Sequence, residues 1–186
     1  MIHEIVSPDI HCDIALVPPI DSSPFYKLVT MGAGAYKMNI PKGYKSIICE
    51  RAEYVILLPK DWNVCADNEE DWWPLRMLKS AARLTVDADD YLWITHSVQI
   101  EEDGSPVAEN TAFNSFVRMP SIGKEGQVVE PLKLSLFGKK VAFYQLFPLY
   151  PEEMEFKLEH GYDNLVELFK EEPMAVNIHR KNYCKE

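Results

Sequence analysis

The chain has 186 residues, of which 47% are apolar, and its 29 acidic side chains outnumber its 19 basic ones. A chain of this length buries about 70% of its unfolded surface, so the composition predicts a single packed domain. The formal charge of -10 repels a phosphate backbone, which argues against a nucleic-acid partner and favours encounter with a basic protein.

The first third of the chain has the patterns of β-strands. Apolar and polar side chains alternate over residues 10–17, and Pro18-Pro19 ends this strand because proline has no N–H for a sheet ladder. An extended run over residues 25–31 leads into a glycine-rich turn at residues 32–35. Residues 52–58 are apolar on both faces, which predicts a strand in the centre of a sheet.

The remaining elements alternate between helices and strands. Pro74 predicts the start of a helix, because its missing N–H is harmless in the first turn, and this helix is expected to end near Leu84. Four more strands are expected at residues 92–100, 113–119, 132–136 and 141–150, with turns at 101–106 and 123–126. Two helices are expected at the end, over residues 151–160, where Gly161 is the C-terminal cap, and over residues 163–170.

This order of elements predicts an α+β fold with a mixed β-sheet flanked by helices. We expect one domain over residues 1–186, with its core at about residues 5–172 and a C-terminal tail over 173–186. No segment predicts a secretion signal or a membrane span. The four cysteines form no Cys-x-x-Cys pair, and no glycine-rich phosphate-binding motif is complete. We therefore expect a cytoplasmic protein without membrane, metal or cofactor.

Several blocks of sequence resemble, in order, those of the suppressor of fused family. The strongest is the segment 51–62, in which a charged start precedes an apolar strand and a turn with Pro59 and Trp62. The others are 7–13 with Pro18-Pro19, Leu28-Val29-Thr30-Met31-Gly32, Met38-Asn39, Trp73-Pro74 with Ala81-Ala82-Arg83, Thr95-His96-Ser97 and 146–153. Together they extend over about 150 residues, so the chain is similar to a suppressor of fused domain.

The resemblance implies a binding domain rather than an enzyme. Animal members of the family have a second domain and bind an extended peptide between the two domains, where the peptide adds as a strand. This chain is similar to the single-domain bacterial members, which are associated with polymorphic toxin systems and proposed as immunity proteins. We therefore expect an immunity or adaptor protein whose partner is another protein, such as a toxin domain or an extended peptide. The oligomeric state stays open.

Leu84, Tyr91, Thr95 and His96 fall in the region that resembles the peptide-facing part of the animal domain, so we expect the partner to bind there. Two departures from the family pattern bear on this site. The glycine expected before the family's histidine is replaced by Thr95, and Gly32 is followed by Ala33-Gly34-Ala35 in place of Met-Ser. The alternative interpretation is that Leu84 and Tyr91 only seal the helix against the core, as apolar and aromatic side chains usually do, and that His96 is a strand histidine with its hydrogen bonds satisfied.

A rival function is a metal-dependent hydrolase that uses Asp9, His11 and Asp13. These side chains alternate along the first strand and share one face, and carboxylate and imidazole groups can ligate a divalent metal. Alternate side chains on a strand are about 7 Å apart, however, so one ion would need further ligands such as Glu53 or His96. The sequence otherwise offers no catalytic residues, and the non-enzymatic interpretation is preferred.

Overall fold

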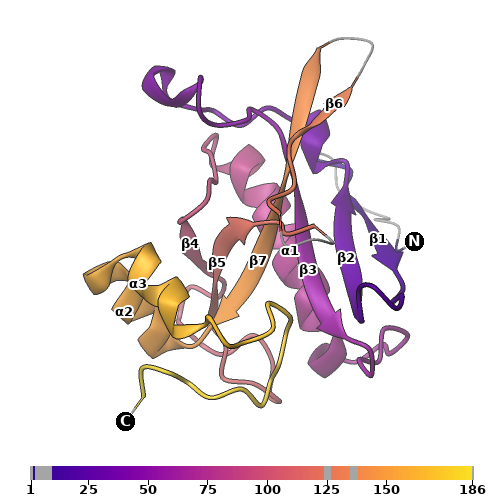
Figure 1. Ribbon diagram of the computed structural model, residues 1–186, viewed down its shortest axis with the longest axis vertical. Coiled ribbons are helices and arrows are strands. Elements are labelled where there is room, and N and C mark those ends of the chain that lie inside the picture. Colours follow the sequence, from indigo (N-terminus) through magenta and orange to yellow (C-terminus); the bar gives the residue numbers. More distant parts are fainter. Residues whose placement is uncertain (1, 3–9, 124–126, 135–137, 186) are drawn as a thin grey trace.

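The computed structural model describes residues 2, 10–123, 127–134 and 138–185, which form an α+β fold around one mixed sheet (Figure 1). Within these residues seven strands pair in the order β1-β2-β3-β7-β5-β4, and β6 pairs with β7 outside that path. The β3–β7 pair is parallel and the other pairs are antiparallel. The strands are β1 (Asp13–Val17), β2 (Phe25–Met31), β3 (Ala52–Pro59), β4 (Ser97–Gln99), β5 (Ser115–Pro120), β6 (Leu132–Leu134) and β7 (Lys139–Leu149). The helices are α1 (Glu69–Asp87), α2 (Pro151–His160) and α3 (Tyr162–Leu168).

Most of the expected elements are present. β2, β3 and α2 begin and end within one residue of the predicted positions, and β3 is a central strand between β2 and β7. Gly161 follows α2 as expected and has a φ of 89°, a positive value that glycine adopts without strain. The predicted turn at 123–126 and the predicted end of the strand at 132–136 lie partly outside the described residues. No helix in the described part of the chain is long and apolar enough to cross a membrane.

Two predicted strands are longer than the strands observed. β1 begins at Asp13, although Ile10 and Cys12 before it are buried. The strand expected at 92–100 is wrong over its first half, since only Ser97–Gln99 forms β4. Leu92 is buried although it lies in a loop. Its apolar side chain therefore produced the pattern of a strand where the structure has none.

Helix α1 begins five residues before the predicted start. Asn68 caps it by accepting a 2.9 Å hydrogen bond from the backbone N–H of Asp71. Pro74 therefore lies inside the helix, where it cannot donate to the carbonyl of Glu70. The side chain of Asn110 donates to that carbonyl at 3.0 Å instead. This contact from a distant loop explains why the proline is tolerated there.

The charged residues at the start of the 51–62 segment fix the turn after β2. One carboxylate oxygen of Glu53 accepts hydrogen bonds from the backbone N–H of Gly32 at 3.0 Å and of Gly34 at 2.9 Å. Its other oxygen accepts from the hydroxyl of Thr30 at 2.6 Å. Arg51 donates to the carbonyl of Gly34 at 3.0 Å. Gly32 has a φ of 125°, and a Cβ there would lie 2.3 Å from the carbonyl oxygen of His11, so no other residue fits.

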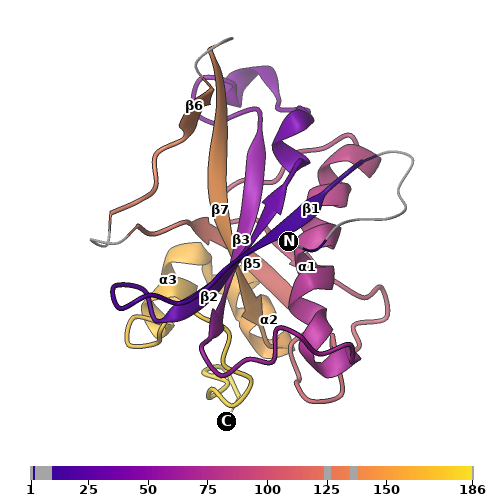
Figure 2. The same cartoon turned by 90° about the vertical axis from the view of Figure 1, so that its right-hand side faces the viewer.

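The sheet has a layer of helix on each side, and the two layers differ in extent. Helix α1 covers one face, where the main core includes Tyr54, Trp73 and Phe116 (Figure 2). Helices α2 and α3 cover part of the other face over a smaller cluster that contains Phe147 and Phe169. In the described part of the chain no helix lies over the rest of that face, and we call it the open face. It consists of Lys27, Val29, Val55, Leu57 and Phe143.

The C-terminal segment contributes buried residues beyond residue 172, where the core was expected to end. Ala175 and Val176 are buried, and the N–H of Val176 donates to the carbonyl of Leu57 at 2.8 Å. This bond forms where β3 and β7 diverge, because their pairing ends at Val55 and Gln145. The tail was predicted from its position in the sequence alone, which carries no information about such a long-range contact.

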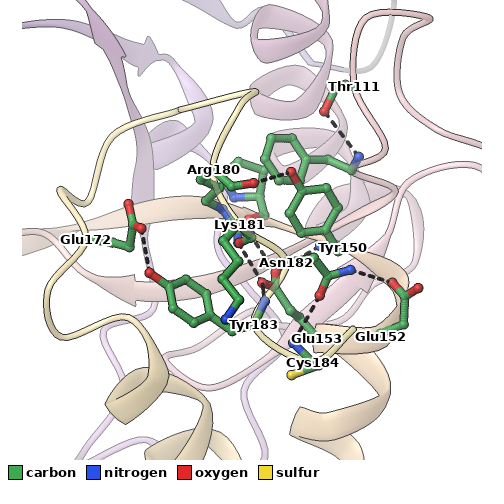
Figure 3. A network of polar contacts seen from close by, with 12 residues as sticks. Thr111, Tyr150, Glu152, Glu153, Glu172, Arg180, Lys181, Asn182, Tyr183 and Cys184 are labelled. Atoms are coloured by element: carbon green, nitrogen blue, oxygen red, sulfur yellow. Dashed lines mark hydrogen bonds and ion pairs between the residues drawn. The ribbon is translucent and has the colours of Figure 1, made fainter. Parts of the chain in front are cut away.

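A buried ion pair anchors this segment (Figure 3). The guanidinium of Arg180 donates to both carboxylate oxygens of Glu153 at 2.6 Å, and both side chains are almost fully buried, with 1% and 0% exposed. The Arg180 guanidinium also donates to the carbonyl of Pro148 at 3.0 Å and lies 4.6 Å from the ring of Tyr150. The hydroxyl of Tyr150 donates to the carbonyl of Arg180 at 2.9 Å. The segment is therefore fixed to the start of α2.

Candidate functional site

The loop before β4 and the edge of β4 bring three of the four predicted site residues together. Tyr91 and His96 have ring centroids 5.1 Å apart, and Thr95 lies between them in sequence, next to β4. Leu84 lies in the last part of α1. Both Leu84 and Tyr91 are half-buried and pack against the main core. Leu84 therefore belongs to the packing of the main core.

Thr95 and His96 form a β-bulge opposite Arg118. The N–H of Thr95 donates to the carbonyl of Arg118 at 3.1 Å, and the N–H of Arg118 donates to the carbonyl of His96 at 2.9 Å. Two residues of one strand thus face one residue of the other, which is the pattern of a bulge. Thr95 has a φ of 78°, so this is the G1 type, whose first residue is normally glycine.

The threonine at this position is strained. A left-handed backbone costs an L-residue about 1–2 kcal/mol, and a β-branched side chain adapts to it poorly. The resemblance to the family predicts glycine at this position, and glycine would adopt this backbone conformation without strain. The strain therefore comes from the threonine. Bulges are frequent beside functional sites because they redirect a neighbouring side chain. Here the neighbour is His96.

His96 is held as a neutral imidazole. The ring Nδ1 of His96 accepts a 3.4 Å hydrogen bond from the backbone N–H of Trp93, and the backbone N–H of His96 donates to the carbonyl of Trp93 at 3.1 Å. Burial lowers the pKa of His96 below its usual value, and the positive charge of Arg118 lowers that pKa further. The neutral ring can therefore donate or accept a hydrogen bond at near-neutral pH without carrying charge.

Arg118 lies below the bulge in an unusual environment. Its side chain is fully buried, and no described side chain or backbone group accepts a hydrogen bond from its guanidinium. The guanidinium lies 4.0 Å from the ring of Tyr144 and 5.0 Å from the ring of Tyr54. Burial lowers the pKa of Arg118 to about 10. The two tyrosine rings thus stabilise the charge by cation–π attraction, with no carboxylate beside it among the described residues.

A cavity of about 420 Å³ adjoins the bulge and is lined by Thr95 and by residues of α2 and the turn into α3. Lys157 of α2 reaches β4, where its ammonium donates to the hydroxyl of Ser97 at 3.0 Å. Leu158 is 67% exposed, and burial raises the pKa of Tyr162 to about 12. The cavity therefore offers an ammonium group, a phenol and an exposed apolar side chain next to the strand edge.

The outer edge of β4 has backbone groups available for pairing. Backbone hydrogen bonds join Ile100 to Asn114 and His96 to Arg118. The backbone N–H and C=O groups of the even-numbered residues in this strand therefore point toward β5. The N–H and C=O groups of Ser97 and Gln99 therefore point away from the sheet. Nothing in the described residues pairs with them. At the opposite edge of the sheet, by contrast, Ile14 of β1 exchanges two hydrogen bonds with Ile2 at 2.9 and 3.0 Å.

The metal-site alternative has little in its favour. His11 Nε2 lies 3.3 Å from a carboxylate oxygen of Asp13, but Asp9 lies outside the described residues. The described ranges contain no group of three side chains that could hold a metal ion. Of the additional ligands considered, Glu53 is engaged by the turn after β2, and His96 lies at the other edge of the sheet. The structure thus does not assemble the wider ligand set.

Comparison with known proteins agrees with the resemblance in the sequence. The family model described as suppressor of fused protein (SUFU) matches residues 8–181. A crystal structure of a SUFU homolog from Neisseria gonorrhoeae FA 1090 superposes with a TM-score of 0.65 at 17% identity, over 99% of this chain and 86% of that chain. Among curated protein sequences, none matches this chain.

Two further solved structures share the fold at lower identity. The structure of the Sufu–Fu complex gives a TM-score of 0.61 at 10% identity and covers 94% of this chain and 77% of that chain. Drosophila Suppressor of Fused gives 0.60 at 10% identity, with 94% of this chain and 42% of that chain covered. At these identities the likeness is one of fold, and this chain corresponds to less than half of the Drosophila protein.

Proposed function

Because this chain belongs to the suppressor of fused family, we propose that it is a non-enzymatic domain that binds another protein. The observation that carries the proposal is the outer edge of β4, where the backbone groups of Ser97 and Gln99 have no partner among the described residues. An extended segment of a partner can satisfy these groups as an added strand. The fold match to a Sufu–Fu complex supports a protein partner in general.

The neighbourhood of the edge supplies the side chains that would select a partner. Neutral His96 and the ring of Tyr91 lie at the start of β4, and the 420 Å³ cavity beside Thr95 can take a side chain of the added strand. Strand addition gives affinity through the backbone, and such pockets give specificity. Tyr91, Thr95 and His96 are therefore the proposed contact residues, and Leu84 belongs to the packing of the main core.

The partner is proposed to be a basic protein, and the role that of an immunity or adaptor protein in the cytoplasm. A formal charge of -10 accelerates encounter with a basic partner, such as a toxin domain with nuclease activity. All four cysteines are free in the structure, as expected in a reducing compartment.

Co-purification tests this role. The protein is expressed with the products of neighbouring genes, and complexes are isolated at physiological salt. The proposal predicts a stable complex with one of these products and, for an immunity protein, loss of that product's toxicity. If no neighbouring product binds and none is neutralised, the immunity role is wrong, and an adaptor role would then need a partner encoded elsewhere.

A further inference from the structure

The open face of the sheet carries a groove with a volume of about 480 Å³. Its floor consists of Val29 of β2, Val55 and Leu57 of β3 and Phe143 of β7. These side chains point away from α1, because Leu28, Tyr54 and the other alternate residues fill the main core. Small-molecule sites are typically pockets of about 300–1,000 Å³ with an apolar lining.

The groove is bounded on three sides, which distinguishes it from an edge that accepts a continuous strand. Residues 22–25 form one rim, residues 121–123 with Val129 form the opposite rim, and Met174 of the C-terminal segment closes one end. Gln145 holds that end in place by donating to the carbonyl of Met174. A compact ligand fits this shape better than a polypeptide that must enter and leave.

The polar groups of the groove point to the chemistry of the ligand. Lys27 is the one charged residue in the described lining, although the chain as a whole has a formal charge of -10. No carboxylate among the described residues pairs with its ammonium group. On the opposite rim, Ser121 is only 7% exposed, and its hydroxyl has no hydrogen-bond partner in the described structure. The lining thus has a cation on one side, a serine hydroxyl on the other and an apolar floor between them.

We propose that the groove binds an aliphatic carboxylic acid with a second hydrogen-bonding group at its far end. The carboxylate pairs with Lys27, the chain lies across Val55, Leu57 and Phe143, and the terminal group bonds to Ser121. Lys27 and Ser121 are three strand steps apart across the sheet, roughly 14 Å at about 4.8 Å per step. The strand register also displaces them by about four residues along the strands, roughly 13 Å at about 3.3 Å per residue. The long side chain of Lys27 covers part of this diagonal, and a ligand of about ten carbons is proposed to cover the rest.

The test is calorimetric titration of the purified protein with decanoate and with 10-hydroxydecanoate below their aggregation concentrations. We expect one saturable site for each acid, with the hydroxy acid bound about fivefold more tightly because it reaches Ser121. Decanol should bind about tenfold more weakly than decanoate, since it lacks the charge for Lys27.

Matched variants locate the site. Lys27→Gln should weaken both acids about tenfold, whereas Lys60→Gln, which removes an exposed lysine at the end of β3, should leave both unchanged. Ser121→Ala should abolish only the preference for the hydroxy acid. Equal effects of the two lysine variants, a preference that survives Ser121→Ala, or the absence of saturable binding would each overturn the proposal. Because these titrations use the protein alone, their outcome is independent of partner binding at β4.

Discussion

Two buried arginines lie in regions of opposite character. Arg180, near the C-terminus, forms a two-point ion pair with Glu153 and is surrounded by aromatic rings and a carbonyl acceptor. Arg118, below the bulge next to β4, has no described hydrogen-bond acceptor and is held by two tyrosine rings. In the first region the charge of the arginine is paired with a carboxylate, whereas the second combines an unpaired charge with a strained threonine at Thr95.

The difference indicates which region maintains the fold and which is available for binding. A fully paired charge stabilises a structure only as long as both partners stay, so the Arg180 region is suited to holding the C-terminal segment. Backbone strain and buried donors without an acceptor persist only where the surrounding structure imposes them. Such features are concentrated at functional sites. The region around β4 therefore has the properties of a binding site, and variants at the two arginines should respond differently.

The largest effect is expected at Arg180. Arg180→Met leaves the Glu153 carboxylate buried without its partner, which should lower the free energy of unfolding by about 3–5 kcal/mol. Chemical denaturation measures this loss. The double variant Arg180→Met with Glu153→Met is the control, and it should recover most of the stability because no buried charge stays unpaired. A double variant as unstable as the single one would show that the ion pair itself contributes the stability.

The same substitution at Arg118 should have the opposite result. Arg118→Met removes a cation–π attraction of about 2 kcal/mol, but it also removes a desolvation penalty of several kcal/mol. We therefore expect the variant to be as stable as the natural protein or more stable, by up to about 2 kcal/mol, in the same denaturation experiment. A loss comparable to that of Arg180→Met would mean that Arg118 has a partner group in solution.

The strain at Thr95 can be relieved by one substitution. Thr95→Gly removes a left-handed penalty of about 1–2 kcal/mol and gives back about 0.5–1 kcal/mol through the greater freedom of the unfolded chain. The net expectation is a stabilisation of about 0.5–1 kcal/mol, measured by thermal unfolding. Thr95→Ala keeps the strain and should bring no such gain. If alanine stabilises as much as glycine, the backbone conformation is not the cause.

A smaller effect concerns pH. The folded state lowers the pKa of His96, so the unfolded chain binds a proton more readily than the folded protein. The contribution of His96 to the free energy of unfolding is therefore fully present above the pKa of the unfolded chain, near 6.5. It decreases as the pH falls below that pKa. His96→Gln should flatten this part of the stability curve when denaturation is repeated from pH 7.5 to 5. An unchanged slope would place the titration on another group.

The sequence predicted the parts of the fold that depend on local pattern. The extended run of β2, the apolar β3 and the proline and glycine at the ends of α2 gave correct boundaries because their signals are contained within each element. The start of α1 was missed because a distant residue, Asn110, compensates for Pro74. Arg180 lies between His179 and Lys181 near the end of the sequence, and nothing in this local pattern indicates that Glu153 pairs with it.

The candidate site was predicted in part for the same reason. The family pattern selected Tyr91, Thr95 and His96 as candidates, and it has glycine at the position of Thr95, where the structure has a positive φ. The apolar residues before Thr95 imitated a strand, so the bulge and the short β4 were not expected. Arg118 gave no signal at all, because an arginine within an apolar strand does not reveal whether it is buried without a partner.

The most direct test of the central claim is the affinity of Gln99→Pro for the gene product that co-purifies with this protein. Proline removes the outward N–H of Gln99 and is tolerated at a sheet edge, so the fold should be retained. The control Gln99→Ala keeps that N–H. We predict at least a tenfold loss of affinity, a difference of about 1.4 kcal/mol, for the proline variant and almost none for the alanine variant. Equal affinities for Gln99→Pro, Gln99→Ala and the natural protein would contradict strand addition at β4.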